Sequence, residues 1–481
     1  MRLTPTLARR YLSLTETKCT PSIVNPSMKD FLLFRRPVAI CQRRRVRLMW
    51  ATAFLAFVFL LPTYVQLSVA NTPLRKQDPP TRGQIMLADG TVLALSTVEG
   101  RQYPHGQLAA NLIGFTGNEG GLEGLERALE PELKKGMPLT LTLDGGVQAS
   151  TERALGEAIN KVDAESGSVV VLERTTGRLV AVANWPTFDP QRWSGTTSAQ
   201  WRNRAIADEY EPGSVVKALT VAALLEENLT APRMVYDVPM RRPYAGTVIN
   251  DIVPHPGTLR TWEILRYSSN VGMTRLVEEV NPATLHGAFQ AFGLGQPVPL
   301  AVPTADGQLA APERWTPLTQ ATMSFGQGLS MTTLQLAAAF NTIANDGVYI
   351  APRLLITDPI RTRPVLRPEV ARTMQRLLHA VIDEGIQTQA EMPGYHVAGK
   401  TGTAQVAVEG RYSNEVFSST FAGFFPADQP FYTIAIMVRG AKRDYQGSQL
   451  AAPLFKEITS DILSMNAVVP STQLLATTHE P

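Results

Sequence analysis

The longest uncharged apolar segment of the chain is residues 48–69, LMWATAFLAFVFLLPTYVQLSV. As a helix with about 1.5 Å of rise per residue it spans ~33 Å, enough to cross a bilayer. Arginines at 43, 44, 45 and 47 precede it. Because positive charge stays on the cytoplasmic side, the pattern predicts a single-pass anchor in the inner (cytoplasmic) membrane. The N-terminus is then cytoplasmic and everything after the anchor lies outside. A secretory signal peptide cleaved after Ser68-Val-Ala70 is the alternative, but a 47-residue basic region before it is far too long for one.

The rest of the chain alternates between strand and helix patterns. Residues 147–162 carry apolar side chains at helical spacing, and two apolar strands follow at 168–173 and 179–185. Two more strands, at 419–425 and 431–438, flank a Pro-rich turn near the end. Between these hairpins lie long helical stretches, at 215–228, 262–279 and 333–344. We therefore predict an α+β fold in which both ends of the domain pair into one antiparallel sheet, flanked by helices and with a helical subdomain beside it.

A smaller module is predicted between the anchor and this domain. It opens with two short strands around Ala88-Asp89-Gly90, continues through a Gly-rich stretch, and ends with a charged helix near Lys135. It has too few apolar residues for a large core of its own. The predicted divisions are a basic cytoplasmic tail (1–47), the anchor (48–69), the module (70–143), the main domain (144–466) and a C-terminal tail (467–481).

The distribution of charge and the positions of the cysteines limit the partners and the reactions that the chain can have. The formal net charge is +3, but residues 1–47 hold eleven Lys or Arg and two acids, so the remainder is mildly acidic and a nucleic-acid partner is not expected. Cys19 and Cys41 both precede the anchor, which leaves no disulfide, thiol or Cys-based metal site outside. The six histidines lack metal-ligand spacing and are interpreted as ordinary surface or core residues. We predict no metal and no cofactor.

Three motifs follow one another along the main domain: Ser214-Val-Val-Lys217, Ser268-Ser-Asn270 and Lys400-Thr-Gly402. In the first, the spacing puts a hydroxyl and an amine on one face at the start of an apolar helix. Burial at this position lowers the pKa of the amine. The uncharged lysine can then accept the proton of the serine. Alone, an S-x-x-K is more often a serine helix cap followed by a lysine that reaches solvent.

The other two motifs supply complementary groups. Ser268 can relay a proton to a leaving amine, and Asn270 can hold a substrate carbonyl or orient the lysine. Lys400 lies in a β-branched alternating stretch that reads as a strand, with Thr401 and Thr403 beside it, a set that suits a carboxylate. Gly402 would let a substrate backbone approach closely. A second S-x-N, at Ser464 and Asn466, lies too near the end to fit the order.

Two other enzyme classes fit these motifs less well. Gly394 to Thr401 also satisfies G-x-x-x-x-G-K-[ST], but a phosphate-binding loop needs a helix after it, and Gly402, Thr403 and Val406 favour a strand. No G-x-S-x-G occurs and no histidine is near either serine motif, so a Ser-His-Asp hydrolase would need distant contacts.

Together, the motifs and their surroundings resemble the class B penicillin-binding proteins, most like the FtsI-type peptidoglycan D,D-transpeptidases. The resemblance covers about residues 140–465 and rests on NRAIADEYEPGSVVKALT, YSSN, SFGQGLSMTTLQLAAAFNTIANDG, PGYHVAGKTGTAQ and STFAGFFP. It implies the transpeptidase fold, a membrane-bound enzyme of cell division that cross-links stem peptides, and acylation by β-lactams. Ser214 would be the nucleophile, Lys217 its base and Ser268 the proton relay, beside Asn270. Lys400, Thr401 and Thr403 would bind the terminal carboxylate, and the amides of Ser214 and Thr403 would form the oxyanion hole.

The likeness extends upstream with departures. RGQIMLADG, PHGQLAANLIGFTG and GLEGLE resemble the N-terminal pedestal motifs of that family, but Leu87-Ala88-Asp89 replaces its Asp-Arg-Asn and the following spacer is short. We expect a truncated pedestal. In this family the pedestal contacts a polytopic glycosyltransferase partner, so its truncation would alter those contacts. D,D-carboxypeptidase or serine β-lactamase activity is the enzymatic alternative. A non-catalytic β-lactam sensor or division scaffold is the alternative of another class.

Overall fold

A computed structural model describes residues 47, 49–58, 82–385, 389–408 and 410–466. The chain divides into two compact units, residues 1–77 and 78–481. In the first, residues 49–58 are helical, with exposed side chains such as Met49 and Trp50. No helix within the described residues has the length and apolar character needed to cross a membrane. Most of the predicted anchor, the basic tail with Cys19 and Cys41, and the C-terminal tail lie outside the described residues, so these remain predictions.

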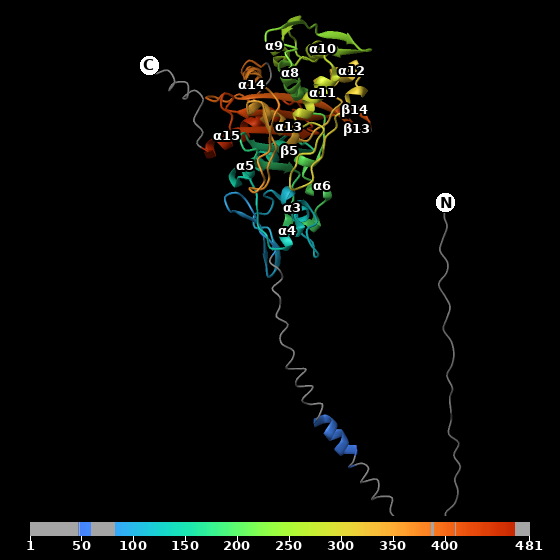
Figure 1. The fold of residues 1–481 in the computed structure, drawn as a ribbon, viewed down its shortest axis with the longest axis vertical. Helices are drawn as coiled ribbons and strands as arrows, with labels where there is room; N and C mark the ends of the chain where they lie inside the picture. The colour runs from blue at the N-terminus through green and yellow to red at the C-terminus, as the bar shows by residue number, and fades with distance from the viewer. Residues whose placement is uncertain (1–46, 48, 59–81, 386–388, 409, 467–481) are drawn as a thin grey trace, which may run out of the picture. The chain divides into compact units, whose positions relative to one another are not determined.

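A five-stranded antiparallel sheet forms the centre of the second unit, in the order β13–β14–β15–β5–β6 (Figure 1). Its strands are β5 (Ser166–Glu173), β6 (Leu179–Trp185), β13 (Ala398–Val408), β14 (Arg411–Phe425) and β15 (Tyr432–Arg439). The first and last hairpins join where β5 pairs with β15, with Val170 opposite Ala435. The predicted closure of the domain's two ends into one sheet is thus confirmed, and β13 is left at an edge.

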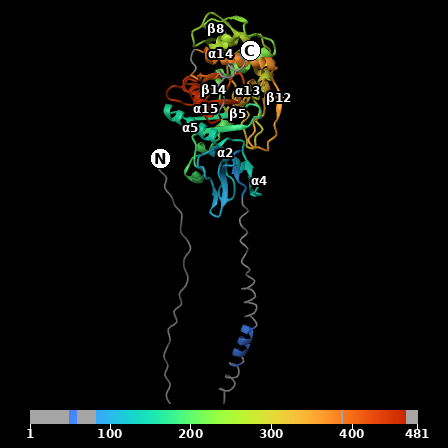
Figure 2. The same cartoon turned by 90° about the vertical axis from the view of Figure 1, so that its left-hand side faces the viewer.

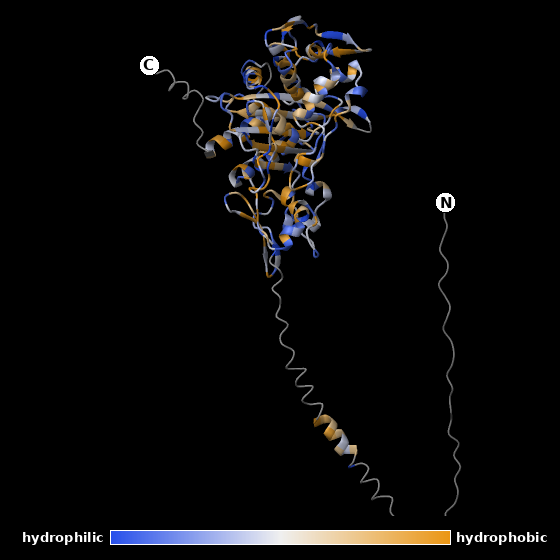
Figure 3. Ribbon diagram, viewed as in Figure 1, coloured by the Kyte–Doolittle hydropathy of each residue, from blue (hydrophilic) through white to orange (hydrophobic). Residues whose placement is uncertain are grey.

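Strand alternation gives this sheet two buried faces. In β5, Val169 and Val171 face one hydrophobic cluster and Val170 and Leu172 face the other. Figure 3 shows apolar residues concentrated on these strands. Helices α5 (Gly145–Val162) and α15 (Ala451–Asn466) cover the first face, and α13 (Thr333–Ala344) covers the second. Residues 166–172 of the central strand β5 are therefore all buried, as its near-continuous apolar sequence requires.

The helical subdomain lies at one end of the sheet and the small module at the other, in both Figure 1 and Figure 2. The principal helices between β6 and β13 are α8 (Val216–Glu226), α9 (Thr261–Arg266), α10 (Asn270–Val277), α11 (Pro282–Ala291), α12 (Pro317–Ser324) and α14 (Pro368–Asp383). Short helical turns connect them: η1 (Pro190–Gly195), α6 (Ser198–Trp201), α7 (Arg204–Ala207), η2 (Gly213–Val215) and η3 (Pro312–Arg314). Small two-stranded sheets, which the sequence did not indicate, pair β7 (Val235–Asp237) with β10 (Thr258–Arg260), β8 (Arg241–Tyr244) with β9 (Thr247–Asn250), and β11 (Val348–Ile350) with β12 (Thr362–Pro364).

The prediction of one continuous helical stretch over residues 262–279 was wrong. The chain leaves the helix after Arg266, Ser268 adopts a left-handed φ of 53°, and a new helix starts at Asn270. The second helix has its own cap, since Ser269 Oγ accepts a hydrogen bond from Gly272 N at 2.7 Å. The interruption places the second motif in a turn between two helices.

The module that precedes the main domain contains a four-stranded sheet in the order β3–β2–β1–β4. Its elements are β1 (Ile85–Met86), β2 (Val92–Thr97), β3 (Gly100–Gln102), β4 (Leu139–Thr140), α2 (Ala110–Ile113), α3 (Gly124–Ala128) and α4 (Glu130–Lys134). The predicted hairpin around Ala88-Asp89-Gly90 is present as β1 and β2. The single charged helix predicted to end near Lys135 is instead two short helices.

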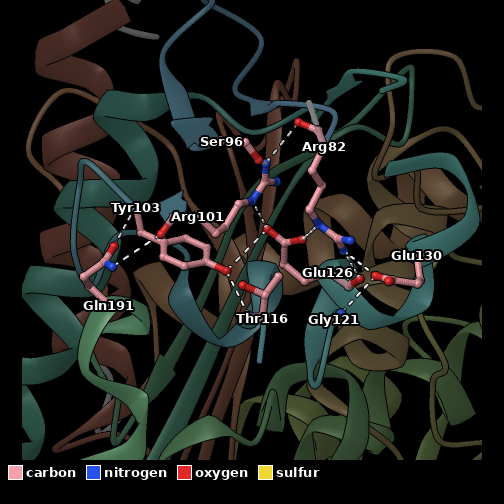
Figure 4. A network of polar contacts seen from close by, with 9 residues as sticks. All are labelled: Arg82, Ser96, Arg101, Tyr103, Thr116, Gly121, Glu126, Glu130 and Gln191. Carbon is pink, nitrogen blue, oxygen red and sulfur yellow. Dashed lines mark hydrogen bonds and ion pairs between the residues drawn. The ribbon is translucent and has the colours of Figure 1, made fainter. Parts of the chain in front are cut away.

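A charged network lies in the interior of this module (Figure 4). The Glu126 side chain is fully buried and accepts hydrogen bonds from Arg82 Nε at 2.6 Å and Arg101 Nε at 2.7 Å. Tyr103 Oη donates to the same carboxylate at 3.4 Å. Two guanidinium groups are needed there because a lone buried carboxylate is very costly.

Apolar contacts join the module to the main domain. The Phe115 ring stacks on Trp193 with 4.6 Å between centroids and meets Trp201 edge-on at 4.9 Å. Leu112 and Leu125 of the module belong to the same hydrophobic cluster as Val170 and Leu172 of β5. Residues 78–481 accordingly form one compact unit, and the module shares its core with the main domain.

Candidate active site

Ser214 lies in η2, immediately before the buried helix α8. Its loop is fixed by contacts to distant segments, because Gly213 N donates to Gly326 O at 3.1 Å and Thr420 Oγ1 donates to Pro212 O at 2.9 Å. Gly213 has a φ of 64°, and a Cβ there would lie 3.0 Å from Thr403 O. Glycine is therefore required where the serine loop passes the β13 strand.

Lys217, one helical turn later, is completely buried. Its Nζ donates to Ser268 O at 2.5 Å and to Asn270 Oδ1 at 2.8 Å, and lies 3.2 Å from Ser268 Oγ. Burial is the main reason that the pKa of Lys217 lies well below its usual range; Lys400 lowers it further and Asp251 opposes the shift. The reading of this motif as a helix cap with a solvent-reaching lysine is wrong, since Ser214 caps no helix and Lys217 does not reach solvent.

Ser268 stands between two buried lysines. Its Oγ is 3.2 Å from Lys217 Nζ and 3.1 Å from Lys400 Nζ, and the Lys400 side chain is 2% exposed. Burial lowers the pKa of Lys400 to about 8. Residues from α8, the α9–α10 turn and β13 are thus joined through one hydroxyl, and the three motifs form a single site.

Ser214 Oγ itself has no hydrogen-bond partner within the described part of the chain, although Ser214 lines the same cleft. Lys217 directs its contacts to the second motif instead. Bonds between nucleophile and base are often loose without substrate. The spacing in sequence correctly places the two groups one turn apart, but it does not reveal that Ser268 and Asn270 occupy the amine.

Lys400, Thr401, Gly402 and Thr403 lie on the edge strand β13, as predicted. A Cβ on Gly402 would lie 2.3 Å from Thr420 Oγ1 and 2.6 Å from Pro212 O, so close packing behind the strand requires this glycine. Thr403 Oγ1 accepts a hydrogen bond from Gly447 N at 2.9 Å. Because β13 continues as a strand to Val408, a phosphate-binding loop is excluded.

A cleft of about 510 Å³ is lined by residues from all three motifs, among them Ser214, Ser268 and Lys400. Its wall also includes residues that sequence reasoning did not select: the stacked rings of Phe417 and Tyr445, 4.2 Å apart, and Arg266. The described residues that line the cleft include Arg266 and Lys400 but no carboxylate. The lining therefore favours an anionic ligand with apolar groups.

Asp251 and His255, just outside the cleft, were also missed. Asp251 Oδ1 accepts from Asn270 N at 2.5 Å, and Oδ2 faces His255 Nε2 at 2.8 Å. Both residues lie in an irregular segment after β9, where no periodicity gives a signal. Within the described residues, no group of three or more His, Cys, Asp and Glu side chains is arranged to hold a metal ion.

Comparison with known proteins agrees with this site. Residues 167–460 match the family model for the penicillin binding protein transpeptidase domain. The Mycolicibacterium smegmatis penicillin-binding protein PbpB is 35% identical over 424 residues, with 76% of this chain and 65% of the relative covered. The Escherichia coli peptidoglycan D,D-transpeptidase FtsI is 32% identical over 404 residues, with 77% and 68% covered.

Solved structures give the same result. Penicillin-binding protein 3 of Mycobacterium tuberculosis, in complex with aztreonam, superposes with a TM-score of 0.77 at 33% identity, covering 82% of this chain and 98% of the other. The chain spans less than two thirds of the length of the mycobacterial PbpB relatives. The match over the whole site and most of the main domain shows that the chain belongs to the penicillin-binding protein transpeptidase family.

Proposed function

We propose that this protein is a peptidoglycan D,D-transpeptidase that cross-links stem peptides through an acyl-enzyme on Ser214. The observation that carries the proposal is the Ser268 hydroxyl between Lys217 and Lys400, in the cleft that Ser214 also lines. This gives a proton path from nucleophile to leaving group at a point where a second cation can hold the substrate. Relatives with the same domain are named peptidoglycan D,D-transpeptidases.

Substrate binding follows from the edge strand. The free edge of β13 offers backbone groups to which an extended peptide can add as a further strand. The terminal carboxylate would be received by Lys400, Thr401 and Thr403, with Lys400 as the cation. Gly402 keeps this part of the strand packed tightly against the serine loop.

The reaction begins when Ser214 Oγ attacks the carbonyl carbon of the penultimate D-alanine and Lys217 takes its proton. Backbone N–H groups of Ser214 and Thr403 would stabilise the oxyanion. Asn270, hydrogen-bonded to Lys217, keeps the amine in place. As the peptide bond breaks, Ser268 passes a proton to the nitrogen of the departing D-alanine.

The acyl-enzyme ester is then attacked by an amine of a neighbouring stem peptide. The new amide bond forms, the amine loses a proton to the Lys217–Ser268 pair, and Ser214 Oγ leaves with a proton restored. A β-lactam would acylate the same serine, and the M. tuberculosis relative has been solved with aztreonam and with ampicillin. A β-lactamase needs a further base to hydrolyse the ester, and the described lining of the cleft supplies no carboxylate for it.

The same proposal covers location and organisation. A single-pass anchor at 48–69, with residues 1–47 cytoplasmic, would place the module (70–143) and the transpeptidase domain (144–466) outside the inner membrane. The uncharged segment and the arginines before it support this topology. A role in cell division, with a polytopic glycosyltransferase and other division proteins as partners, rests on the likeness to FtsI.

Product analysis tests the activity. Purified protein is given a stem-peptide donor ending in D-Ala-D-Ala, with and without an amine acceptor, and products are identified by mass spectrometry. The proposal predicts a donor–acceptor amide and free D-alanine. Hydrolysed donor alone, even with acceptor present, would identify a carboxypeptidase, and no turnover would favour a sensor or scaffold.

Two serine variants distinguish the second motif of the active site from the other S-x-N sequence near the end of the chain. Ser268→Ala should slow turnover by about 100-fold or more, because the proton relay is lost. Ser464→Ala, in the second S-x-N, removes a hydroxyl that only donates to Asp461 O and should have no effect. Equal activity of the two variants would contradict the relay.

A further inference from the structure

A buried acid–base pair lies behind the second motif. Asp251 follows β9, and its side chain is 2% exposed; the His255 side chain is completely buried. The two are joined by a contact of 2.8 Å between Asp251 Oδ2 and His255 Nε2. Neither residue lines the cleft.

Asp251 organises the turn that carries Ser268 and Asn270. Its Oδ1 accepts from the backbone N–H groups of Asn270, at 2.5 Å, and Val271, at 3.0 Å. Its Oδ2 also accepts from Ser269 Oγ at 2.5 Å. One carboxylate thus engages three consecutive residues at the start of α10, the N-cap Ser269 and the first two helical residues, directly after the left-handed Ser268. A non-glycine residue in that conformation persists where its surroundings fix it.

His255 completes the arrangement. Its Nδ1 lies 2.7 Å from Pro256 O, an acceptor, so this nitrogen carries a hydrogen. Nε2 faces a carboxylate oxygen, so one further proton lies between the ring and Asp251. Four donors thus surround the buried carboxylate: the N–H groups of Asn270 and Val271, Ser269 Oγ and His255 Nε2.

We propose that Asp251 and His255 are positioning residues that hold the Ser268–Asn270 turn against Lys217. This inference rests on the proposed transpeptidase function. Asp251 binds the turn at Ser269 and Asn270, and the same turn presents Asn270 Oδ1 and Ser268 O to Lys217 Nζ at 2.8 and 2.5 Å.

Variants of Asp251 and His255 should also shift the pKa of Lys217, an effect that residues supporting only the fold would not have. The charged groups facing Lys217 are Lys400, which lowers its pKa, and Asp251, which raises it; His255 lies behind Asp251 with the Tyr267 ring 5.8 Å away. Removing the Asp251 charge lowers the pKa of Lys217, so the free amine persists to lower pH. Removing the proton held by His255 leaves Asp251 uncompensated and raises that pKa.

The test uses the full chain and the second-order rate of acylation by a fluorescent penicillin, measured across pH. Asp251→Asn should slow acylation by roughly 10- to 100-fold, because the turn is less well held, and move the acid limb of the profile to lower pH. His255→Gln keeps an N–H donor to Asp251 but removes the second ring proton, and should move the acid limb to higher pH. Asp237→Asn is the matched control, since Asp237 pairs with Arg275 at 3.3 Å and is 75% exposed.

Opposite displacements of the acid limb support the proposal. A wild-type rate and profile in both variants would overturn it, and so would slower acylation with an unshifted limb and a lower Tm, which indicates support of the fold alone. If Asp251→Asn fails to fold, the His255→Gln variant still tests the proposal, through the direction in which the acid limb of its pH profile moves. Failure of the wild-type protein to label would instead refute the proposed function, whereas normal labelling with unshifted variants refutes only this inference.

Discussion

Two buried lysines that share one serine hydroxyl define the site at the scale of single residues. The motif spacing predicts Lys217 beside Ser214, and the buried helix explains why its pKa falls. The burial of Lys400 and its contact with Ser268 Oγ could not be predicted, because strand periodicity says nothing about contacts across 132 residues. Asp251 and His255 escaped prediction for the same reason: only the folded chain brings them to the second motif.

Lys217 should control acylation. Lys217→Ala is expected to reduce the acylation rate by about 10²- to 10⁴-fold, because the proton of Ser214 loses its acceptor. The measurement is stopped-flow labelling with a fluorescent penicillin. Lys456→Ala, a change of the same type on α15, should retain the wild-type rate. Unaltered acylation in Lys217→Ala would mean that another group is the base.

Lys400 should set the upper pH limit for carboxylate binding. With a pKa of about 8, Lys400 is charged below that pH and neutral above it, so affinity for a carboxylate ligand is greatest below pH 8 and falls as pH rises through it. Competition binding of a D-Ala-D-Ala peptide across pH measures this. Lys400→Arg, whose charge persists, should remove the decline; a decline that remains in this variant would assign it to another group.

At the scale of elements, the edge strand β13 and the broken helix before α10 position the chemistry. The strands, α5 and α13 follow from apolar alternation and helical spacing, which depend only on local sequence. The break at Ser268 depends on the Asp251 carboxylate, which binds Asn270 N from 19 residues earlier in the chain, so the helical pattern across 262–279 was misleading. Tertiary contacts here override local propensity.

Packing behind β13 predicts a strong effect at Gly402. Gly402→Ala would place a Cβ 2.3 Å from Thr420 Oγ1, so the strand and serine loop must separate, at a cost of about 1–3 kcal/mol. Chemical denaturation and penicillin labelling should both show the loss. Gly257→Ala, where a Cβ meets nothing within 4 Å, is the control. Wild-type stability and labelling in Gly402→Ala would contradict this packing.

At the scale of the whole molecule, residues 78–481 are one compact unit, although the sequence pattern predicts a boundary at residue 143. The module has few apolar residues, which predicts a weak core of its own. Its buried Glu126 network and the contacts of Phe115 provide additional stabilising interactions. Sequence alone could not identify that network, since Arg82, Arg101 and Glu126 look like ordinary surface charges.

Glu126 should therefore matter for stability more than a surface acid does. Glu126→Gln leaves Arg101 without its counter-charge and leaves Arg82 with Glu130 alone, and is expected to lower the free energy of unfolding by about 3–5 kcal/mol. Denaturant unfolding of the full chain measures this. Glu157→Gln, in an exposed pair with Arg153, should have little effect. Equal stability of the two variants would refute the role given to the network.

Peptide mass spectrometry after treatment with penicillin can determine whether Ser214 is the nucleophile. Trypsin should release residues 205–217, AIADEYEPGSVVK, in which Ser214 is the only serine. We predict a stable penicilloyl adduct on this peptide, and no adduct anywhere in Ser214→Ala. An unmodified peptide in the wild-type protein, or an adduct that survives in the alanine variant, would contradict the account.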